Sequence, residues 1–442
     1  MSNNLEKKVY IETFGCQMNE YDSERILYCL EEKGYKTTLS PEESNIIIIN
    51  TCAVREKAEN RLFGHLGKFK NLKESRNDLI ICVGGCTAQS MGKEIQEKCP
   101  FVDIVFGTHN ISELPSLIDR KFASRKSICS VINDGFDYEL DKVNRVNKYS
   151  ALVPVIIGCN NFCTYCIVPY VRGREKSLNP DTIIENIKKL VFDGVLEVTL
   201  LGQNVNSYGK DLSIDIDFPI LLEKVSYIKG LKRIRFMTSH PKDYSKNLIQ
   251  VIKDRDNIVS HIHLPLQSGS NRVLKLMNRK YSREGYMDII DNVKSNIKDY
   301  SITTDIIVGF PGEEKKDFED TMDIVEKVRC DRAFTFIYSP RNGTSAAEMA
   351  DPVPLKEKKK WFNELLEIQN NISFERNKEH LGKVVKVLVE SFSPKDADML
   401  EGRMENNMIV NFKGKKESIG KIVDIKIEKT MSFYLSGRII TK

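Results

Sequence analysis

Residues 151–166 read ALVPVIIGCNNFCTYC, an apolar run followed at once by cysteines spaced C-x3-C-x2-C. The apolar part is typical of a buried strand, and the three cysteines share one short loop at its end. Three thiolates on such a loop can hold three irons of a cubane cluster and leave the fourth iron without a protein ligand. A structural zinc site is the alternative, but it requires four ligands, and the next histidine in the chain is His240.

Five more apolar runs follow this stretch, each with helix-compatible sequence after it: LEVTLLG, LKRIRFM, IVSHIHLPL, ITTDIIVGF and AFTFIYS. Six βα units are too few to close an eight-stranded barrel, so they predict an open, partial barrel within residues 145–375. Residues just past the C-terminal ends of its strands then face a shared mouth, where barrels of this kind have their active sites.

The segment 7–124 also alternates short apolar runs with helical patterns. The runs KVYIETF, SNIIIIN, LIICVGG and DIVFG predict an open parallel sheet with helices packed on it. Cys16, Cys52 and Cys86 directly follow the first three runs. Because the C-terminal ends of parallel strands share one sheet edge, we expect these cysteines to meet there, although any one alone could be an ordinary small apolar residue in a turn.

Two other segments complete the domain organisation. Residues 125–144 show neither helical nor strand periodicity and are interpreted as a linker. Residues 376–442 contain short alternating runs separated by Gly, Asn and Ser, which predict a small all-β barrel of the kind that often binds oligonucleotides. This last segment holds 14 Lys and Arg against nine Asp and Glu, so it supplies the whole formal net charge of +5.

The composition of the chain, 41% apolar and 29% charged, is that of a globular protein. Its 442 residues predict two or three domains, and the alternating strand and helix patterns make this an α/β multidomain protein. The longest aliphatic run, residues 46–49, is far shorter than the roughly 20 residues of a membrane span. We therefore expect a cytoplasmic protein that does not associate with membranes. Eleven cysteines in such a chain favour metal chemistry over disulfides. Five lack a strand-end placement and are expected to be core or surface thiols: Cys29, Cys82, Cys99, Cys129 and Cys330.

The residues around the other six cysteines resemble those of a known family. They are TFGCQMN (13–19), NTCAVR (50–55), GGCTAQ (84–89) and the loop that holds Cys159, Cys163 and Cys166. With these motifs the chain resembles the methylthiotransferase family of radical S-adenosylmethionine enzymes from about Lys7 to its C-terminus. The resemblance implies a central radical S-adenosylmethionine barrel and a C-terminal RNA-binding TRAM domain. It also implies two 4Fe-4S clusters: one on Cys159, Cys163 and Cys166, whose open iron binds S-adenosylmethionine, and an auxiliary one on Cys16, Cys52 and Cys86.

Members of this family differ in substrate: an isopentenylated adenosine beside the anticodon, a threonylcarbamoylated adenosine there, or an aspartate of a ribosomal protein. Gln17-Met18 and the runs at 54–60 and 168–177 resemble those of the isopentenyl-adenosine members. This implies methylthiolation of C2 of N6-isopentenyladenosine in tRNA, with one S-adenosylmethionine as methyl donor and a second as radical source. An electron donor such as flavodoxin or ferredoxin is implied as well, and we expect a monomer. The alternative outside this class is a catalytically silent RNA-binding iron–sulfur protein.

Polar residues near the later barrel strands are candidates to bind S-adenosylmethionine, although each could simply end a strand or cap a helix. They are Glu197, Gln203, Asn204, Gln267, Ser268 and Asp305. The superfamily pattern Gly-x-Ile-x-Gly-x-x-Glu is only partly met, because Asp305 replaces the first glycine and Glu313 comes one residue late.

Basic side chains are candidates for RNA phosphates, although charged runs are usually solvated surface. These candidates are Arg172, Arg174, Lys176, Lys413, Lys415 and Lys416. His261 and His263 are two residues apart in a predicted strand, and we expect core or lining residues there rather than a metal-binding pair.

Overall fold

The computed structural model describes residues 7–53, 56–133, 138–140, 142–394 and 396–440; Val54 and Arg55 of the motifs above lie outside these ranges. The chain divides into two compact units. The first contains residues up to 146 together with 152–160 and 166–178, and the second contains 147–151, 161–165 and the chain from 179 onward. Within the described ranges, no helix has both the length and the apolar character needed to cross a membrane.

The first unit contains a six-stranded sheet in the order β2-β1-β3-β4-β5-β6, and every neighbouring pair is parallel. In that order the strands are Lys36–Thr37, Lys8–Thr13, Ile46–Thr51, Ile80–Gly85, Ile104–Phe106 and Ile128–Ser130. The central strands β3 and β4 are buried along their whole length, as parallel strands with helices on both faces should be. The predicted open parallel α/β sheet is confirmed.

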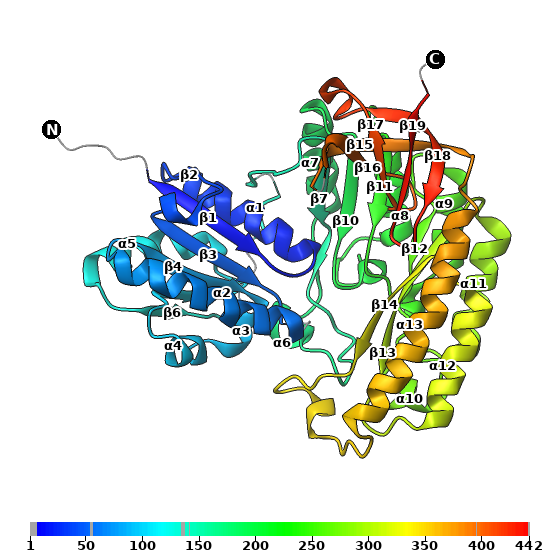
Figure 1. Ribbon diagram of the computed structural model, residues 1–442, viewed down its shortest axis with the longest axis horizontal. Coiled ribbons are helices and arrows are strands. Elements are labelled where there is room, and N and C mark those ends of the chain that lie inside the picture. The colour runs from blue at the N-terminus through cyan, green and yellow to red at the C-terminus, as the bar shows by residue number, and fades with distance from the viewer. Residues whose placement is uncertain (1–6, 54–55, 134–137, 141, 395, 441–442) are drawn as a thin grey trace. The chain divides into compact units, whose positions relative to one another are not determined.

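Helices cover both faces of this sheet (Figure 1). On one face, α1 (Gln17–Glu31) and α5 (Leu114–Ser124) pack Leu30 and Leu117 against the strands. On the other face, α2 (Glu56–Ser75), α3 (Cys86–Met91) and α4 (Glu94–Lys98) contribute Leu66, Ala88 and Ile95. Because α1 begins next to Cys16 and α3 begins at Cys86, the helix starts hold the cysteines at the edge where the strands end.

The interval 125–144 is not a linker throughout, and the interpretation based on its missing periodicity is wrong in part. Residues Ile128–Ser130 form β6, which pairs in parallel with β5 at the end of the sheet. Three residues are too few to show a strand period, so no pattern marks them in the sequence. Farther along, the Asn144 side chain donates to Glu31 at 2.7 Å, and its backbone N–H donates to the Glu24 carbonyl at 3.0 Å.

The second unit contains the strands of the predicted partial barrel. β10 (Glu197–Leu201) pairs with β11 (Arg233–Phe236), and β13 (Ser301–Val308) pairs with both β12 (His261–His263) and β14 (Arg332–Ile337), all in parallel. The third strand of the first sheet is β7 (Ser150–Pro154), of which only Ser150 and Ala151 belong to the second unit. A parallel bridge between Ile234 and Ile258 continues the order from one sheet to the other. These strands match the six predicted apolar runs.

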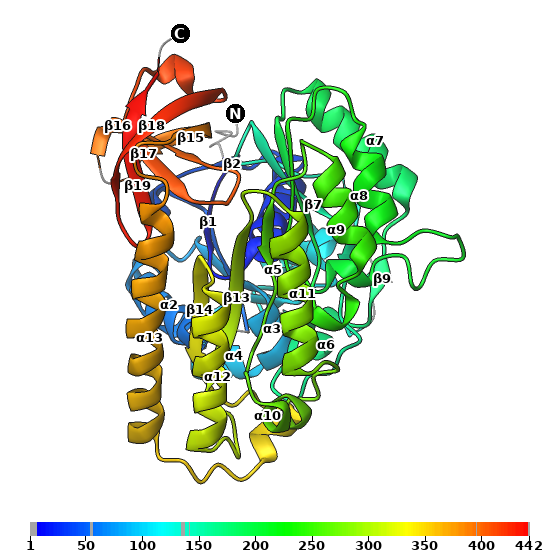
Figure 2. The ribbon, with the colours of Figure 1, turned by 90° about the vertical axis from the view of Figure 1, so that its right-hand side faces the viewer.

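Helices alternate with these strands (Figure 2). They are α7 (Pro180–Phe192), α8 (Phe218–Ser226), α9 (Lys246–Asp254), α10 (Asn271–Leu276), α11 (Arg283–Asn296) and α12 (Lys315–Val328). The longest helix, α13 (Leu355–Lys378), runs alongside α12, and Trp361 stacks on Phe318 with ring centroids 5.5 Å apart.

The C-terminal segment is a closed barrel in the order β15-β16-β17-β19-β18. The strands are Val384–Ser393, Asp396–Arg403, Ile409–Lys413, Tyr434–Ile439 and Ile422–Thr430. Its interior is filled by apolar side chains, among them Val387, Leu400 and Phe412. This confirms the predicted small all-β barrel.

Candidate cluster sites

Cys16, Cys52 and Cys86 follow β1, β3 and β4 at one edge of the N-terminal sheet. These strands are in parallel register, so their C-terminal ends lie next to one another. Thr13 pairs with Asn50, and Asn50 pairs with Gly84, so the residues two or three positions before each cysteine are direct neighbours in the sheet. The structure therefore brings together three cysteines that are far apart in the sequence.

Two glycines permit this close approach. A Cβ on Gly15 would lie 2.7 Å from the Cβ of Cys52. Gly85 has a φ of +88°, and a Cβ there would lie 2.3 Å from Oδ1 of Asn50. Side chains at these two positions would separate the strand ends, since Cβ atoms are not found this close to other atoms. The glycines of the TFGC and GGC motifs thus have a steric role beside the cysteines.

Asparagines of the same motifs brace the site. Asn50 donates from its side chain to the Asn19 carbonyl at 2.8 Å and to the Ser23 hydroxyl at 2.8 Å. The Cys16 thiol lies 3.4 Å from Oδ1 of Asn19. These contacts join the start of α1 to the end of β3, so the two segments that carry Cys16 and Cys52 are tied together.

The electrostatic environment favours a thiolate at Cys16. The hydrogen bond with Cys52 lowers the pKa of Cys16 to about 6, and the positive charge of Arg172 acts in the same direction. Burial raises the pKa of Cys86, while Arg172 opposes that rise. Cys16 is exposed, whereas Cys52 and Cys86 are buried. Because the thiolate is the form that binds metal, three thiols with an adjacent cation fit a cluster held by cysteines.

The loop of Cys159, Cys163 and Cys166 is fixed at several points. In the first unit, Cys159 N–H donates to the Gly173 carbonyl at 3.1 Å, and a Cβ on Gly158 would lie 2.1 Å from the Arg174 carbonyl oxygen. In the second unit, Thr164 N–H donates to the Met277 carbonyl at 3.1 Å. These backbone contacts hold the loop without using the cysteine side chains.

A buried arginine contacts the loop that carries Cys159, Cys163 and Cys166, here called the radical loop. Arg279 is 9% exposed, and its Nη1 donates to the Cys163 sulfur at 3.3 Å. Its other nitrogens donate to Tyr281 Oη and to the Pro265 carbonyl. A guanidinium that donates to a sulfur fits a loop whose cysteines carry negative charge. No sequence pattern singles out Arg279, because a pattern shows neither its burial nor its partner.

The S-adenosylmethionine candidates fall into two groups. Gln203 is half-buried after β10, and Asp305 lies on β13 with Oδ2 at 3.6 Å from Nε2 of His263. Gln267 is buried, with a φ of +64°. Its backbone N–H donates to the Asp305 carbonyl, and its carbonyl accepts from Ile307 N–H. These three residues remain candidates to bind S-adenosylmethionine.

The other candidates have structural partners. Glu197 begins β10 rather than ending it, and its carboxylate accepts from Arg235 Nε at 2.9 Å. Asn204 is 1% exposed and donates to Asp243 at 2.7 Å. The structure therefore favours the alternative stated above for these two residues, in which they stabilise the barrel.

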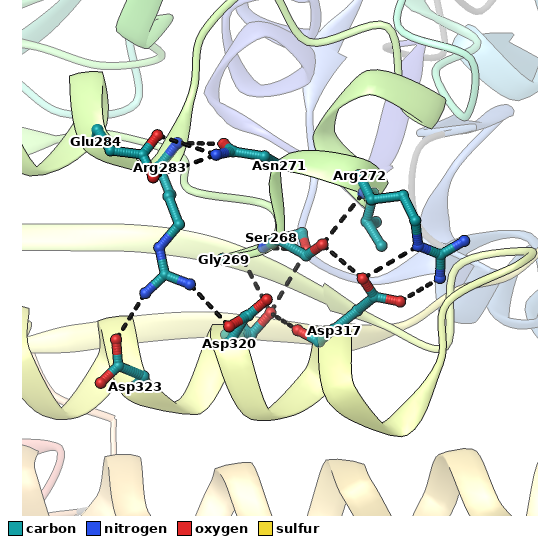
Figure 3. A network of polar contacts seen from close by, with 12 residues as sticks. Ser268, Gly269, Asn271, Arg272, Arg283, Glu284, Asp317, Asp320 and Asp323 are labelled. Carbon is teal, nitrogen blue, oxygen red and sulfur yellow. Dashed lines mark hydrogen bonds and ion pairs between the residues drawn. The ribbon is translucent and has the colours of Figure 1, made fainter.

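Ser268 belongs to a buried polar network at α12 (Figure 3). Its hydroxyl accepts from Ser270 N–H at 3.2 Å, and the neighbouring Gly269 N–H donates to Thr321 Oγ1 at 2.9 Å. A Cβ on Gly269 would lie 2.4 Å from the Asp320 carbonyl oxygen. This turn is pressed against α12, which favours a packing role for Ser268.

The expected RNA contact of Arg172 is wrong. Its side chain is 3% exposed and forms an ion pair with Asp22 at 2.6 Å, so it cannot reach an RNA phosphate. The position of Arg172 beside the cysteine loop predicts an RNA contact, but a local pattern does not show that the side chain is buried or that Asp22 is its partner. The remaining basic candidates are exposed: Arg174, Lys176, Lys413, Lys415 and Lys416.

His261 and His263 are buried core residues, as expected. His261 Nε2 and His263 Nδ1 each lie 3.0 Å from the Thr303 hydroxyl. Burial lowers the pKa of His261. Among the cysteines outside both trios, burial raises the pKa of Cys330 to about 12 and that of Cys82 well above its usual range. Thiols of this kind are inert core residues.

Two further observations concern the described residues as a whole. Among the described residues, no group of three or more His, Cys, Asp or Glu side chains is arranged so that it could hold a single metal ion. A surface pocket of about 600 Å³ lies between α7 and α8 and is lined by residues such as Phe192 and Tyr227. This pocket contains none of the predicted site residues, so we assign the chemistry to the cysteine trios instead.

Comparisons with known proteins agree with this architecture. Residues 8–107 match the uncharacterized protein family UPF0004, residues 153–325 match the radical SAM superfamily, and residues 378–440 match the TRAM domain. The fold and these matches define a radical S-adenosylmethionine enzyme that ends in a TRAM barrel.

Relatives that match nearly the whole chain identify the family within this class of enzymes. A tRNA-2-methylthio-N(6)-dimethylallyladenosine synthase from Thermoanaerobacter pseudethanolicus is 50% identical over 434 residues, which cover 98% of this chain and 92% of that protein. One from Clostridium perfringens is 48% identical and covers 100% of this chain and 99% of its own. The chain therefore belongs to the tRNA-2-methylthio-N(6)-dimethylallyladenosine synthase family. Two 4Fe-4S clusters and S-adenosylmethionine are characteristic of this family.

A solved structure shares the fold at much lower identity. The radical S-adenosylmethionine methyltransferase TsrM from Kitasatospora setae, with cobalamin and a [4Fe-4S] cluster bound, matches with a TM-score of 0.56. The match covers 78% of this chain and 77% of that one at 12% identity. This likeness concerns the fold alone.

Proposed function

We propose that this chain attaches a methylthio group to C2 of N6-isopentenyladenosine next to the anticodon of tRNA. The observation that carries the proposal is the convergence of Cys16, Cys52 and Cys86 at one sheet edge, in a chain that also has a C-x3-C-x2-C loop. Under this proposal Cys16, Cys52 and Cys86 hold the auxiliary 4Fe-4S cluster, and Cys159, Cys163 and Cys166 hold the cluster that binds S-adenosylmethionine. The names of the full-length relatives support the same substrate.

The end of the radical loop packs on the auxiliary trio, which supports joint action of the two sites. Helix α6 (Val168–Arg172) begins two residues after Cys166. Ile167 and Val171 share a buried cluster with Cys86 and Ala53, and the Thr108 hydroxyl donates to the Val171 carbonyl at 2.7 Å. Insertion of sulfur at a carbon requires both groups near one substrate atom, and this packing keeps the two cysteine segments together.

The reaction explains why the chain needs a radical cofactor. Adenine C2 bears a hydrogen with no useful acidity, so a general base has little to act on. S-adenosylmethionine bound at an iron–sulfur cluster supplies a carbon radical and, in a second molecule, a methyl group. The protein's own part is to hold the groups in position and to exclude side reactions. Gln203, Gln267 and Asp305 are the proposed contacts to S-adenosylmethionine.

We also propose how the chain is divided and which partners it has. The proposed domains are 7–124, 145–375 and 376–442. Of residues 125–144 between the first two, Ile128–Ser130 add β6 to the N-terminal sheet. Lys413, Lys415 and Lys416 are exposed on the C-terminal barrel, where phosphate contacts would add affinity more than sequence choice. The proposed setting is the cytoplasm, with a monomeric enzyme that receives electrons from a donor such as flavodoxin or ferredoxin.

Nucleoside analysis of tRNA tests the substrate. In a strain that lacks the gene, the 2-methylthio-isopentenyl nucleoside should disappear and its unmethylthiolated precursor should accumulate. Complementation with the wild-type gene is the positive control, and a Cys16, Cys52 and Cys86 triple alanine variant should fail to restore the nucleoside. Persistence of the methylthiolated nucleoside in the deletion strain would exclude this substrate.

Anaerobic reconstitution tests the cofactors independently of the substrate. We expect about eight irons per chain, as two cubane clusters require, and formation of 5′-deoxyadenosine under reducing conditions. The Cys16, Cys52 and Cys86 triple alanine variant should hold about four. If it still held eight, the auxiliary site would be elsewhere, and absence of 5′-deoxyadenosine from the wild type would favour a silent RNA-binding protein.

A further inference from the structure

Two opposite charges are buried beside one cysteine of the auxiliary trio. Arg172 ends α6 and donates from Nε to the Cys86 sulfur at 3.2 Å. The same guanidinium forms an ion pair with Asp22 of α1 at 2.6 Å, and the two side chains are 3% and 1% exposed. Arg172 thus lies between Asp22 and the Cys86 sulfur. The charges of both residues act electrostatically on Cys86.

The surrounding structure fixes this pair in place. Arg172 Nη1 donates to the Tyr138 hydroxyl at 3.2 Å, and that hydroxyl lies 3.4 Å from Oδ1 of Asp22. Helix α6 is anchored through Val171, whose carbonyl accepts from Thr108. Asp22 belongs to α1, which begins next to Cys16. Arg172 belongs to α6, which follows Cys166. Each charge is therefore fixed to a segment that carries a cysteine.

Stability alone does not account for the pair. A buried ion pair is often no more stabilising than apolar residues of the same volume, because both charges lose their hydration. Its charges act strongly on their surroundings, since the interior has a low effective dielectric constant. Hydrogen bonds to cysteine sulfurs and nearby net charge are among the properties that set the reduction potential of an iron–sulfur cluster.

We propose that the Arg172–Asp22 pair sets the reduction potential of the auxiliary cluster. This inference rests on the auxiliary cluster of the proposed function. Arg172 raises the potential through its charge and its hydrogen bond to Cys86, and Asp22 partly offsets that charge. Both are positioning residues, since they act through Cys86 and not on the substrate.

Single substitutions should shift the potential in opposite directions. Asp22→Asn leaves the arginine charge without its counter-ion and should move the midpoint to a more positive value. Arg172→Gln leaves the carboxylate alone and should move it to a more negative value. The double variant should lie between them, and Arg172→Lys, which keeps the charge, should lie closer to the parent than Arg172→Gln does.

The measurement is an EPR-monitored redox titration of the reconstituted full chain with Cys159, Cys163 and Cys166 replaced by alanine, so that only the auxiliary cluster is present. Asp103→Asn is a matched control. It removes a buried carboxylate of the same sheet that accepts from Ile81 N–H and pairs with Lys73. Ile81 and Gly85 are four residues apart on β4, or about 13 Å, so this control should leave the midpoint unchanged.

The outcomes separate this inference from the proposed function. Shifts of the same sign in both single variants, or an unchanged midpoint in both with the cluster retained, would overturn the role of the pair. If Arg172→Gln does not fold, the Asp22→Asn and double variants still decide, because Asp22→Asn is nearly isosteric. If the parent holds no iron at all, the auxiliary site itself fails.

Discussion

Among single residues, Arg279 is a buried cation whose guanidinium contacts the sulfur of Cys163 in the radical loop. No carboxylate of the described residues lies within ion-pair distance of its guanidinium, whereas the Cys163 sulfur lies at 3.3 Å. A buried charge is costly without a partner. The anionic thiolates of a loaded cluster would provide that partner, so Arg279 should couple the folding of the barrel to cluster binding.

We therefore predict that Arg279→Met reduces the stabilisation gained on reconstitution. In the wild type, cluster binding should raise the thermal midpoint, because a group that binds only the folded state stabilises it. In the variant the difference between the apo and reconstituted midpoints should be smaller, and iron should be lost faster to a chelator. Lys280→Met, the exposed neighbour, is the control. An equal gain in both variants would contradict the coupling.

The buried carboxyl group of Glu313 should make the stability of the folded protein depend on pH. It is 1% exposed and accepts from Gly309 and Phe310 N–H, and burial raises its pKa to about 7 from an ordinary value of 4.5. A carboxyl group whose folded pKa is raised binds its proton more tightly in the folded state. The associated stability is present below pH 4.5 and is lost as the pH rises through 7.

Glu313→Gln should remove this dependence. Relative to the wild type, the variant should gain about 3 kcal/mol of unfolding free energy between acid pH and pH 8. Thermal unfolding of the apo protein at several pH values measures the trend. Glu319→Gln, on the exposed side of α12, should keep the wild-type dependence. A Glu313→Gln variant that also keeps it would show that Glu313 titrates normally.

At the scale of elements, the partial barrel and the C-terminal barrel share buried charged contacts. Arg235 on β11 donates to Glu197 and to the Met404 and Glu405 carbonyls, at 2.9, 2.5 and 2.6 Å. Arg233 donates to the Arg403 and Lys386 carbonyls, both at 2.9 Å. Glu197, a sequence candidate for binding S-adenosylmethionine, thus holds the arginine that contacts the C-terminal barrel.

We predict that Arg235→Met loosens the C-terminal barrel. Breaking a buried pair by removing one partner costs about 3–5 kcal/mol, here because Glu197 would lose its nearer counter-ion. Limited trypsin digestion should then cut faster at Lys378, the exposed last residue of α13, and at Lys383, which is exposed just before β15. The Glu197→Gln and Arg235→Met double variant should be cut more slowly than the single variant. Digestion of Arg235→Met at the wild-type rate would refute this docking role.

Elements with strong periodicity or a fixed neighbour could be predicted from the sequence. The central strands β3 and β4 are continuous apolar runs, and the ends of parallel strands must meet, so the approach of Cys16, Cys52 and Cys86 followed from the strand assignment alone. β6 is too short for a period. The roles of Arg172, Arg279 and Glu197 depend on burial and on partners distant in the chain, which a local pattern does not contain.

At the scale of the whole molecule, each part supplies one requirement of the proposed reaction. The N-terminal sheet gathers one cysteine trio, the loop after β7 carries the other, and the basic C-terminal barrel offers exposed lysines. Full-length identity near 50% to named synthases extends over all three parts. Both cysteine trios should therefore be needed for one modification of tRNA.

The most direct test of that claim is mass spectrometry of nucleosides from isopentenylated tRNA after incubation with reconstituted protein, S-adenosylmethionine and a low-potential reductant. We expect the wild type to convert the isopentenyl nucleoside to its 2-methylthio derivative. The variant with Cys16, Cys52 and Cys86 replaced by alanine should still form 5′-deoxyadenosine but no methylthiolated nucleoside. Methylthiolation by that variant would show that Cys16, Cys52 and Cys86 are dispensable, and no methylthiolation by the fully loaded wild type would exclude the proposed reaction.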